Sequence, residues 1–428
     1  MNRYRRSELN YNLASKIIPL GSQTFSKSVT QYPFGISPLY MEKAKGSKIW
    51  DVDGNEYIDL VNALASITIG YNDKAVNVAI KKQLKKGTIF SLPGILEYQV
   101  SELLVNLIPC AEMVRFGKNG SDVTSAAVRL ARAYTNRDLV LVCGYHGWQD
   151  WYIGSTSKNK GVPKAVSDLT HSFKFNDIDS LKKLFLKFPG QIAAVILEPM
   201  NLEFPKGDFL KEIRELCNLH SSVLIFDETI TGFRFSNGGA QKLFNVTPDL
   251  ATFGKGIANG FPISALVGKR EIMMEIEKIF YSGTFAGELL SLAAAKVVLE
   301  MHLQDEVCKS LTSIGSELSG KIEKIIQDTN MEDILKITGH PTWRFLNWSG
   351  TSNVTSSELK TYFLQEIFKR GLLLIGTHNV STALSSKDIL FISDIYAEVL
   401  ENMNELLLQN NLTQQLEVQP LEPLFKVR

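Results

Sequence analysis

The sequence predicts a two-domain α/β protein: a large domain with a doubly wound, mostly parallel sheet, and a smaller α+β domain. The chain has 428 residues, which is long for one compact domain. From about residue 100 to 270, short apolar runs alternate with amphipathic helical patterns, as in parallel sheets. The last third is less regular. We therefore expect a large domain over 66–300, a small domain over 301–428, and an N-terminal segment, 1–65, that packs with the small domain.

The individual elements follow from local patterns. Apolar and polar residues alternate over 47–59 around Asp53-Gly54-Asn55, which predicts a β-hairpin because Gly54 tolerates a positive φ. Helical spacing runs from Val123 to Tyr134 and again from Phe209 to Cys217. Further helical patterns lie near 305–328, 356–370 and 391–409. Short apolar runs predict five strands of the large sheet: Met113–Phe116, Leu139–Cys143, Ile192–Leu197, Val223–Phe226 and Leu250–Phe253.

Composition and charge exclude several classes of protein. Lys plus Arg minus Asp plus Glu is 46 − 45, or +1, which gives no broad field for nucleic acid or an anionic membrane. No apolar run approaches the roughly 20 residues that a membrane helix needs. The N-terminus has no apolar signal-peptide core, and the four cysteines form no CxxC pair. We therefore expect a cytoplasmic protein with reduced thiols.

Chemistry is expected in the loops after the strands, because ligands of such sheets bind at the carboxyl ends of the strands. The loop after the first strand carries Gly120 and Ser121 at the start of a helix, which suits an anion, although an ordinary N-cap is the simpler explanation. Tyr145, between glycines after the second strand, can stack on a planar ring or close the core.

The next three loops bring acids and a lysine. Glu198 follows the third strand, and Asp227 and Glu228 follow the fourth, where a buried carboxylate needs a partner. Asp227 is the better candidate because it lies nearest the strand. Lys255 lies between two glycines after the fifth strand, and a desolvated lysine amine becomes nucleophilic.

Together these residues match one cofactor. An anion-binding helix start, a stacking aromatic ring, an acid for a ring nitrogen and a lysine amine are what pyridoxal phosphate requires. The six histidines show no HExxH or paired spacing, so we expect no metal site.

The sequence resembles the class III aminotransferases, and among them the glutamate-1-semialdehyde aminomutase branch, from about residue 17 to 405. The similarity is carried by these segments: WDVDGNEYIDL at 50–60, NGSDVTSAAVRLARAYT at 119–135, YHG at 145–147, LEP at 197–199, LIFDETITGFR at 224–234, FGKGIANGFPISALVG at 253–268 and GTFAGELLSLAAA at 283–295. The stretch from Asp227 to Lys255 is the most specific.

The resemblance implies a fold type I enzyme dependent on pyridoxal phosphate. Lys255 matches the lysine that binds the cofactor as a Schiff base and moves the substrate proton, and Asp227 matches the acid that faces the ring nitrogen. Gly120 and Ser121 match the phosphate site, and Tyr145 matches the stacked aromatic residue. Thr284 matches a phosphate ligand that comes from the neighbouring subunit, so the resemblance implies a homodimer.

Departures from the aminomutase pattern bear on the substrate. Lys27 stands where the aminomutase has a carboxylate-binding arginine, and lysine lacks the bidentate fork of arginine. Glu288 stands where many relatives have asparagine. These differences favour an aminotransferase acting on other aldehydes or ketones, sugar-derived ones included, with glutamate as donor. The candidates for binding the substrate are Lys27, Glu198, Arg234 and Arg344, and both arginines have a structural salt bridge as the alternative.

Three other functions remain open at this stage. Glutamate-1-semialdehyde 2,1-aminomutase and a racemase or epimerase would use the same residues. A non-catalytic binding subunit with this fold is the third, and the presence of Lys255, Asp227 and Tyr145 together argues against it.

Overall fold

The computed structural model describes residues 3–304 and 306–422, and the chain forms two compact units. The described parts of one unit are 3–73 and 310–422, so both ends of the chain contribute to it. The other unit comprises 74–304 and 306–309. It begins and ends eight or nine residues later than the large domain expected from the sequence. None of the helices in the described ranges is both long and apolar enough to cross a membrane.

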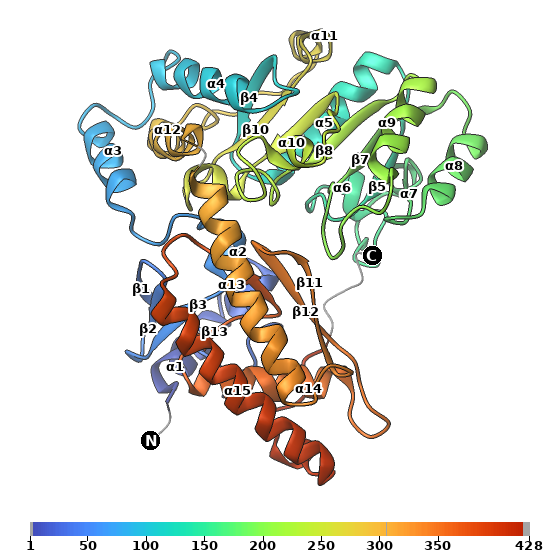
Figure 1. The fold of residues 1–428 in the computed structure, drawn as a ribbon. Helices are drawn as coiled ribbons and strands as arrows, with labels where there is room; N and C mark the ends of the chain where they lie inside the picture. The colour runs from blue at the N-terminus through green and yellow to red at the C-terminus, as the bar shows by residue number, and fades with distance from the viewer. Residues whose placement is uncertain (1–2, 305, 423–428) are drawn as a thin grey trace. The chain divides into compact units, whose positions relative to one another are not determined.

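The second unit is built on a seven-stranded sheet (Figure 1). Its strands, in spatial order, are β4 (Met113–Gly117), β10 (Ser264–Gly268), β9 (Leu250–Phe253), β8 (Val223–Asp227), β7 (Ile192–Leu197), β5 (Leu139–Cys143) and β6 (Thr170–Ser172). The run from β9 to β6 is parallel, and every residue of β7 is buried, as expected for a strand covered on both faces.

All five strands predicted for this sheet are present. Two of them, β4 and β8, extend one residue further than the apolar runs, so Asp227 is the last residue of its strand. Strand β10, which was not predicted, pairs antiparallel with both β4 and β9. The short edge strand β6 was not predicted either. The sheet is therefore mostly parallel with one antiparallel strand.

Helices cover this sheet on both faces (Figure 1). The amphipathic α5 (Gly120–Thr135) buries Val123, Ala127 and Leu130 in one core with Val140, Ile196 and Ile225 of the sheet. The other helices of this unit are α3 (Lys74–Leu84), α4 (Ile95–Leu107), α6 (Asp150–Ile153), α7 (Lys164–Ser167), α8 (Ile178–Lys187), α9 (Phe209–Leu219), α10 (Gly239–Leu243), α11 (Arg270–Met273) and α12 (Leu289–Leu303).

The first unit contains two smaller sheets. One has the order β1 (Met41–Lys45), β2 (Lys48–Asp51), β3 (Glu56–Asp59) and β13 (Leu372–Leu373); the predicted hairpin forms its β2–β3 pair. The other has the order β11 (Leu335–His340), β12 (Trp343–Trp348) and β14 (Thr377–Asn379). The helices of the first unit are α1 (Arg5–Ala14), α2 (Asn62–Ala65), α13 (Glu306–Asp328, which begins in the second unit), α14 (Ser356–Lys369) and α15 (Ser386–Leu408).

The short element α2 is a left-handed turn. Four consecutive L-residues, from Asn62 to Ala65, have φ between 46° and 68°. Side chains hold the start of the turn: Asp59 Oδ1 accepts the backbone N–H groups of Val61 and Asn62 at 2.6 and 3.1 Å, and Asn379 Nδ2 donates to Val61 O at 2.9 Å. A left-handed helical turn costs L-residues about 1–2 kcal/mol each, so α2 carries backbone strain.

We expect Ala63→Gly to raise the free energy of unfolding by about 1 kcal/mol, because glycine adopts φ of +51° without a Cβ penalty. The matched control is Ala397→Gly in the right-handed α15, where glycine lowers stability by about 1 kcal/mol. Urea denaturation of both variants measures the difference. Destabilisation by both glycines would show that α2 is not strained.

Candidate active site

Asp227 ends β8 with a buried carboxylate that has partners on both oxygens. Oδ1 accepts Thr229 N at 3.1 Å, Thr229 Oγ1 at 2.6 Å and Thr252 Oγ1 at 3.1 Å. Oδ2 lies 2.9 Å from His146 Nδ1. Burial alone would raise the pKa of Asp227, but the His146 contact and the Thr229 hydrogen bonds outweigh it and lower the pKa. The carboxylate is therefore an anion at neutral pH.

His146 is the positioning partner of this carboxylate. Its ring is 1% exposed, stacks against Trp151 with centroids 6.4 Å apart, and meets Tyr152 edge-on at 5.3 Å. Its backbone carbonyl accepts Thr124 Oγ1 at 2.8 Å. The ring is thus fixed in direction, and with it the oxygen of Asp227 that it contacts.

Lys255 follows β9, next to β8 in the sheet, and begins the short helix η3 (Lys255–Ala258). Its φ of 39° is unusual for a residue with a Cβ and indicates local backbone strain at this position. Burial lowers the pKa of Lys255 to about 8, and the opposing effects of Glu198 and Asp227 do not restore it. The amine therefore lies within electrostatic reach of both carboxylates.

Tyr145 and Glu198 complete this cluster from β5 and β7. The backbone N–H of Tyr145 donates to Glu198 Oε2 at 3.0 Å, and Asn201 Nδ2 donates to the same oxygen at 2.8 Å. The Tyr145 ring is 44% exposed, so it is not a core residue, and it packs edge-on against Tyr152 at 5.7 Å. Burial raises the pKa of Tyr145, and Asp227 and Glu198 add to the rise.

The start of α5 offers an anion site beside the cluster. The first N–H groups of a helix have no partner within the helix, and here they belong to Gly120 and Ser121. The space around them requires glycines: a Cβ on Gly147 would lie 2.5 Å from Ser121 Oγ, and a Cβ on Gly120 or Gly254 would press on Thr229 Cγ2 at 3.1 or 3.2 Å.

These features fit pyridoxal phosphate. The glycine-lined helix start suits the phosphate, the anionic Asp227 suits a protonated ring nitrogen, and Lys255 has the lowered pKa that reaction with an aldehyde requires.

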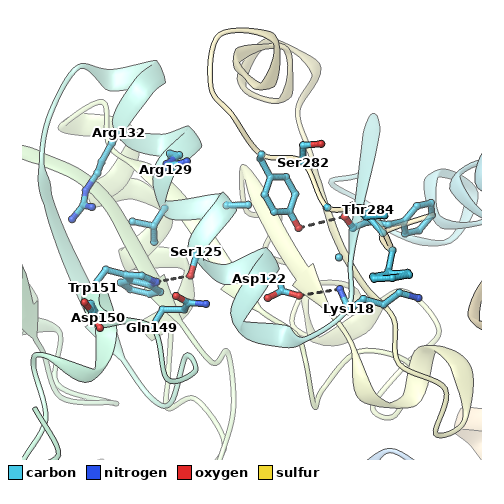
Figure 2. Close-up of a pocket in the computed structure, with 18 of the residues that line it drawn as sticks. Lys118, Asp122, Ser125, Arg129, Arg132, Gln149, Asp150, Trp151, Ser282 and Thr284 are labelled. Carbon is cyan, nitrogen blue, oxygen red and sulfur yellow. Dashed lines mark hydrogen bonds between the residues drawn. The ribbon is translucent and has the colours of Figure 1, made fainter. Parts of the chain in front are cut away.

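Thr284 lies apart from this cluster, on the exposed segment that precedes α12. It lines a groove of about 770 Å³ together with Lys118 and Asp122 of the α5 start and Arg129 and Arg132 further along that helix (Figure 2). Thr284 is exposed on the described chain.

Other acids have structural tasks. Glu228 is fully buried and accepts the backbone N–H groups of Ala240 and Gln241 at 2.5 and 3.0 Å, and burial raises its pKa. Glu288, the position that departs from the aminomutase pattern, caps α12 through Leu290 N at 2.7 Å and pairs with Lys118 Nζ at 3.1 Å.

The remaining substrate candidates are in different surroundings. Arg234 is completely buried, and burial lowers its pKa to about 10. Arg344, on β12 of the first unit, donates to Gly339 O at 2.8 Å and to Ser319 Oγ at 3.1 Å, with Glu323 3.7 Å away. Lys27 ends the short helix η2 (Phe25–Lys27) of the same unit.

Thr252 was not predicted as a site residue, although its hydroxyl contacts Asp227. Thr252 lies opposite Asp227 in the β8–β9 register, so a hydroxyl at the end of the neighbouring strand was the available signal. Within residues 3–304 and 306–422, no group of three or more His, Cys, Asp or Glu side chains is placed to hold a metal ion.

Comparisons with known proteins agree with this site. The family model described as "Aminotransferase class-III" matches residues 32–407. The 3-aminobutyryl-CoA aminotransferase of Cloacimonas acidaminovorans is 32% identical over 94% of this chain and 98% of its own. The glutamate-1-semialdehyde 2,1-aminomutase of Thermosipho melanesiensis is 36% identical over 86% of this chain and 94% of its own.

Solved structures show the same architecture. An omega-transaminase from Sphaerobacter thermophilus aligns with a TM-score of 0.85 at 26% identity, covering 94% of this chain and 99% of that one. The fold is that of the fold type I transaminases. With the family model matching most of its length, the chain belongs to the class III aminotransferases, enzymes that use pyridoxal phosphate.

Proposed function

We propose that this enzyme transfers an amino group, with glutamate as donor, to an aldehyde or ketone acceptor. The observation that carries the proposal is that an anionic Asp227 and the low-pKa amine of Lys255 lie at the carboxyl ends of adjacent strands, within electrostatic reach.

Each residue has a distinct task. When bound, pyridoxal phosphate supplies the electron sink that stabilises negative charge at the substrate Cα. Lys255 removes the proton from Cα and returns it, because its amine is neutral at little energetic cost. Asp227 would face the ring nitrogen and favour its protonated form, and Tyr145 would stack on the ring. The N–H groups of Gly120 and Ser121 would hold the phosphate.

We also propose that the active form is a homodimer in which Thr284 serves the neighbouring subunit's phosphate site. Exposed apolar side chains support this: Phe280 and Phe285 flank Thr284 and are 86% and 62% exposed, and Leu92 and Ile95 are 79% and 69% exposed. Leu92 and Thr284 both line another groove, which adjoins the one shown in Figure 2. Exposed apolar patches of this kind mark association surfaces.

The cytoplasm is the proposed location. The four cysteines, Cys110, Cys143, Cys217 and Cys308, are free thiols, and three of them are buried. Free thiols are typical of proteins in reducing compartments.

A second candidate function is an intramolecular aminomutase, which the 36% identical relative favours. The same residues would serve it, but no external amino donor would be consumed. Against it, Lys27 stands at the position of the carboxylate-binding arginine, as the resemblance indicates.

The test is a single-turnover experiment. Holoenzyme is mixed with glutamate, the loss of the visible cofactor band is followed, and acceptors are then added: short aldehydes, keto acids, keto sugars, a β-keto thioester and glutamate-1-semialdehyde. The proposal expects glutamate to convert the enzyme and one carbonyl acceptor to restore the band. Turnover of glutamate-1-semialdehyde without any donor would instead establish the aminomutase.

The pKa of Lys255 predicts how cofactor uptake depends on pH. With a pKa of about 8 instead of 10.5, the neutral amine is roughly 300-fold more abundant at pH 7 than in an ordinary lysine. The fraction of Lys255 in the reactive neutral form therefore increases as the pH rises towards this pKa, and nearly all of the amine is neutral at higher pH. We expect the rate of pyridoxal phosphate uptake by apo-protein to rise with pH and level off above about pH 8, as measured by stopped-flow absorbance. A rate still rising steeply at pH 10 would contradict the lowered pKa.

A further inference from the structure

A second cavity adjoins the cluster of Tyr145, Glu198, Asp227 and Lys255, and no function has been assigned to it so far. It has a volume of about 590 Å³ and lies at the carboxyl ends of β5, β6 and β7. Gly144 and Glu198 form part of its wall, so it borders the site of Tyr145. Small-molecule sites commonly have volumes of about 300–1,000 Å³, so this space accommodates more than the reacting carbon of a substrate.

The hydroxyl groups in its wall are mostly acceptors. Ser155 Oγ donates to Tyr152 O at 2.7 Å, Thr156 Oγ1 to Ile153 O at 2.8 Å, and Ser180 Oγ to Asp177 O at 2.7 Å. Since a hydroxyl has one hydrogen, these three groups can offer a ligand only their lone pairs.

The remaining polar groups do not reverse this balance. The carboxylates of Glu198 and Glu203 also line the cavity and accept hydrogen bonds, and the amide of Asn201, a further lining residue, donates to Glu198 Oε2 at 2.8 Å. Ser157 and Ser172 are exposed hydroxyls without a side-chain hydrogen bond to any described residue, and Lys174 is an exposed cation at the rim. A phosphate or sulfate needs several donors, so the wall is poorly matched to an anion.

Apolar surface completes the cavity. Phe173, Phe175 and Leu202 contribute flat or branched faces between the polar groups. A ligand that matches both the hydrogen-bond acceptors and the apolar faces of this wall has many hydroxyl donors on a carbon skeleton.

We propose that this cavity binds the non-reacting, polyhydroxylated part of a sugar-like carbonyl acceptor. The proposal rests on the aminotransferase function and deepens it, because it names the class of acceptor. Ser157 and Ser172 are the specificity-determining residues, since their hydroxyls are not committed to other groups of the described chain.

The test uses two bulky variants and one control in the holoenzyme. Ser157→Trp and Ser172→Trp fill the cavity, whereas Asn159→Trp changes an exposed residue of the same loop that does not line it. The probes are D-erythrose and butanal, which have the same number of carbons and differ in hydroxyl groups. We expect wild type to prefer erythrose at least tenfold in kcat/KM of the second half-reaction, and both cavity variants to lose this preference while butanal stays within twofold. Asn159→Trp keeps it.

A binding measurement separates this proposal from the enzymatic one. Titration with xylitol, which cannot react, should give a Kd that rises at least tenfold in the two cavity variants and not in Asn159→Trp. Equal losses for erythrose and butanal, or a defect only with acetoacetyl-CoA as acceptor, would overturn the proposed ligand class. Amino transfer to butanal without any preference for erythrose would overturn the proposed ligand class and leave the aminotransferase function intact. Binding of xylitol without amino transfer to any acceptor would overturn the aminotransferase function and leave the proposed ligand class intact.

Discussion

Lys255→Ala is expected to lower kcat for amino transfer by about 10⁴-fold, the upper range for loss of a positioned acid–base group. In the proposed mechanism the lysine has two roles: it would attach the cofactor, and it would move the proton at the substrate Cα. Its pKa of about 8 makes it effective in both. The variant should bind pyridoxal phosphate only non-covalently, so borohydride treatment should no longer add the cofactor's mass to the peptide that contains residue 255.

The matched control is Lys269→Ala, which removes another lysine of the same unit, one that pairs with Asp249 at 2.7 Å. It should keep the covalent cofactor and most of the activity. Partial rescue of Lys255→Ala by added methylamine would support the proton-transfer task. Full activity in Lys255→Ala, or cofactor fixed by borohydride at another lysine, would remove the basis of the proposed mechanism.

Much of the site could be predicted from the sequence because each part follows a strand. Apolar runs locate the strands, and parallel strands bring their carboxyl ends to one edge, so Tyr145, Glu198, Asp227 and Lys255 were expected together. The mutual effects of these groups on the pKa values of Lys255 and Tyr145 agree with that expectation.

The parts that could not be predicted depend on contacts distant in the sequence. The pairing of His146 with Asp227 spans 81 residues, and the position of Thr252 depends on the β8–β9 register. Strand β10 was not predicted because its sequence, SALVG, continues a loop segment without a clear boundary. Its antiparallel direction is set by pairing with β4, which lies far away in the sequence. The left-handed α2 turn has no sequence signal, since NALA is an ordinary helical tetrapeptide.

Asp227→Asn is expected to lower kcat by about 10²-fold, because a buried hydrogen bond to a charged group contributes about 1.5–3 kcal/mol. Asparagine keeps the size of the side chain and can still accept from Thr229 and Thr252, so the fold should persist. It cannot carry the negative charge that, in the proposed mechanism, would keep the ring nitrogen protonated. The lowered pKa of Asp227 means that wild type holds this charge throughout the neutral range and loses it only in acid.

Asp249→Asn provides the contrast that isolates the charge effect. Asp249 is also a buried carboxylate of the same sheet domain, and it pairs with Arg214 at 2.8 Å and with Lys269 at 2.7 Å, away from the cluster. Its loss should reduce stability without changing the ¹⁵N chemical shift of the cofactor's ring nitrogen. Asp227→Asn should move that shift toward the unprotonated value and lower kcat together. If the nitrogen stayed protonated in Asp227→Asn while kcat fell, the acid would act only by shaping the site, and the electrostatic task assigned to it would be wrong.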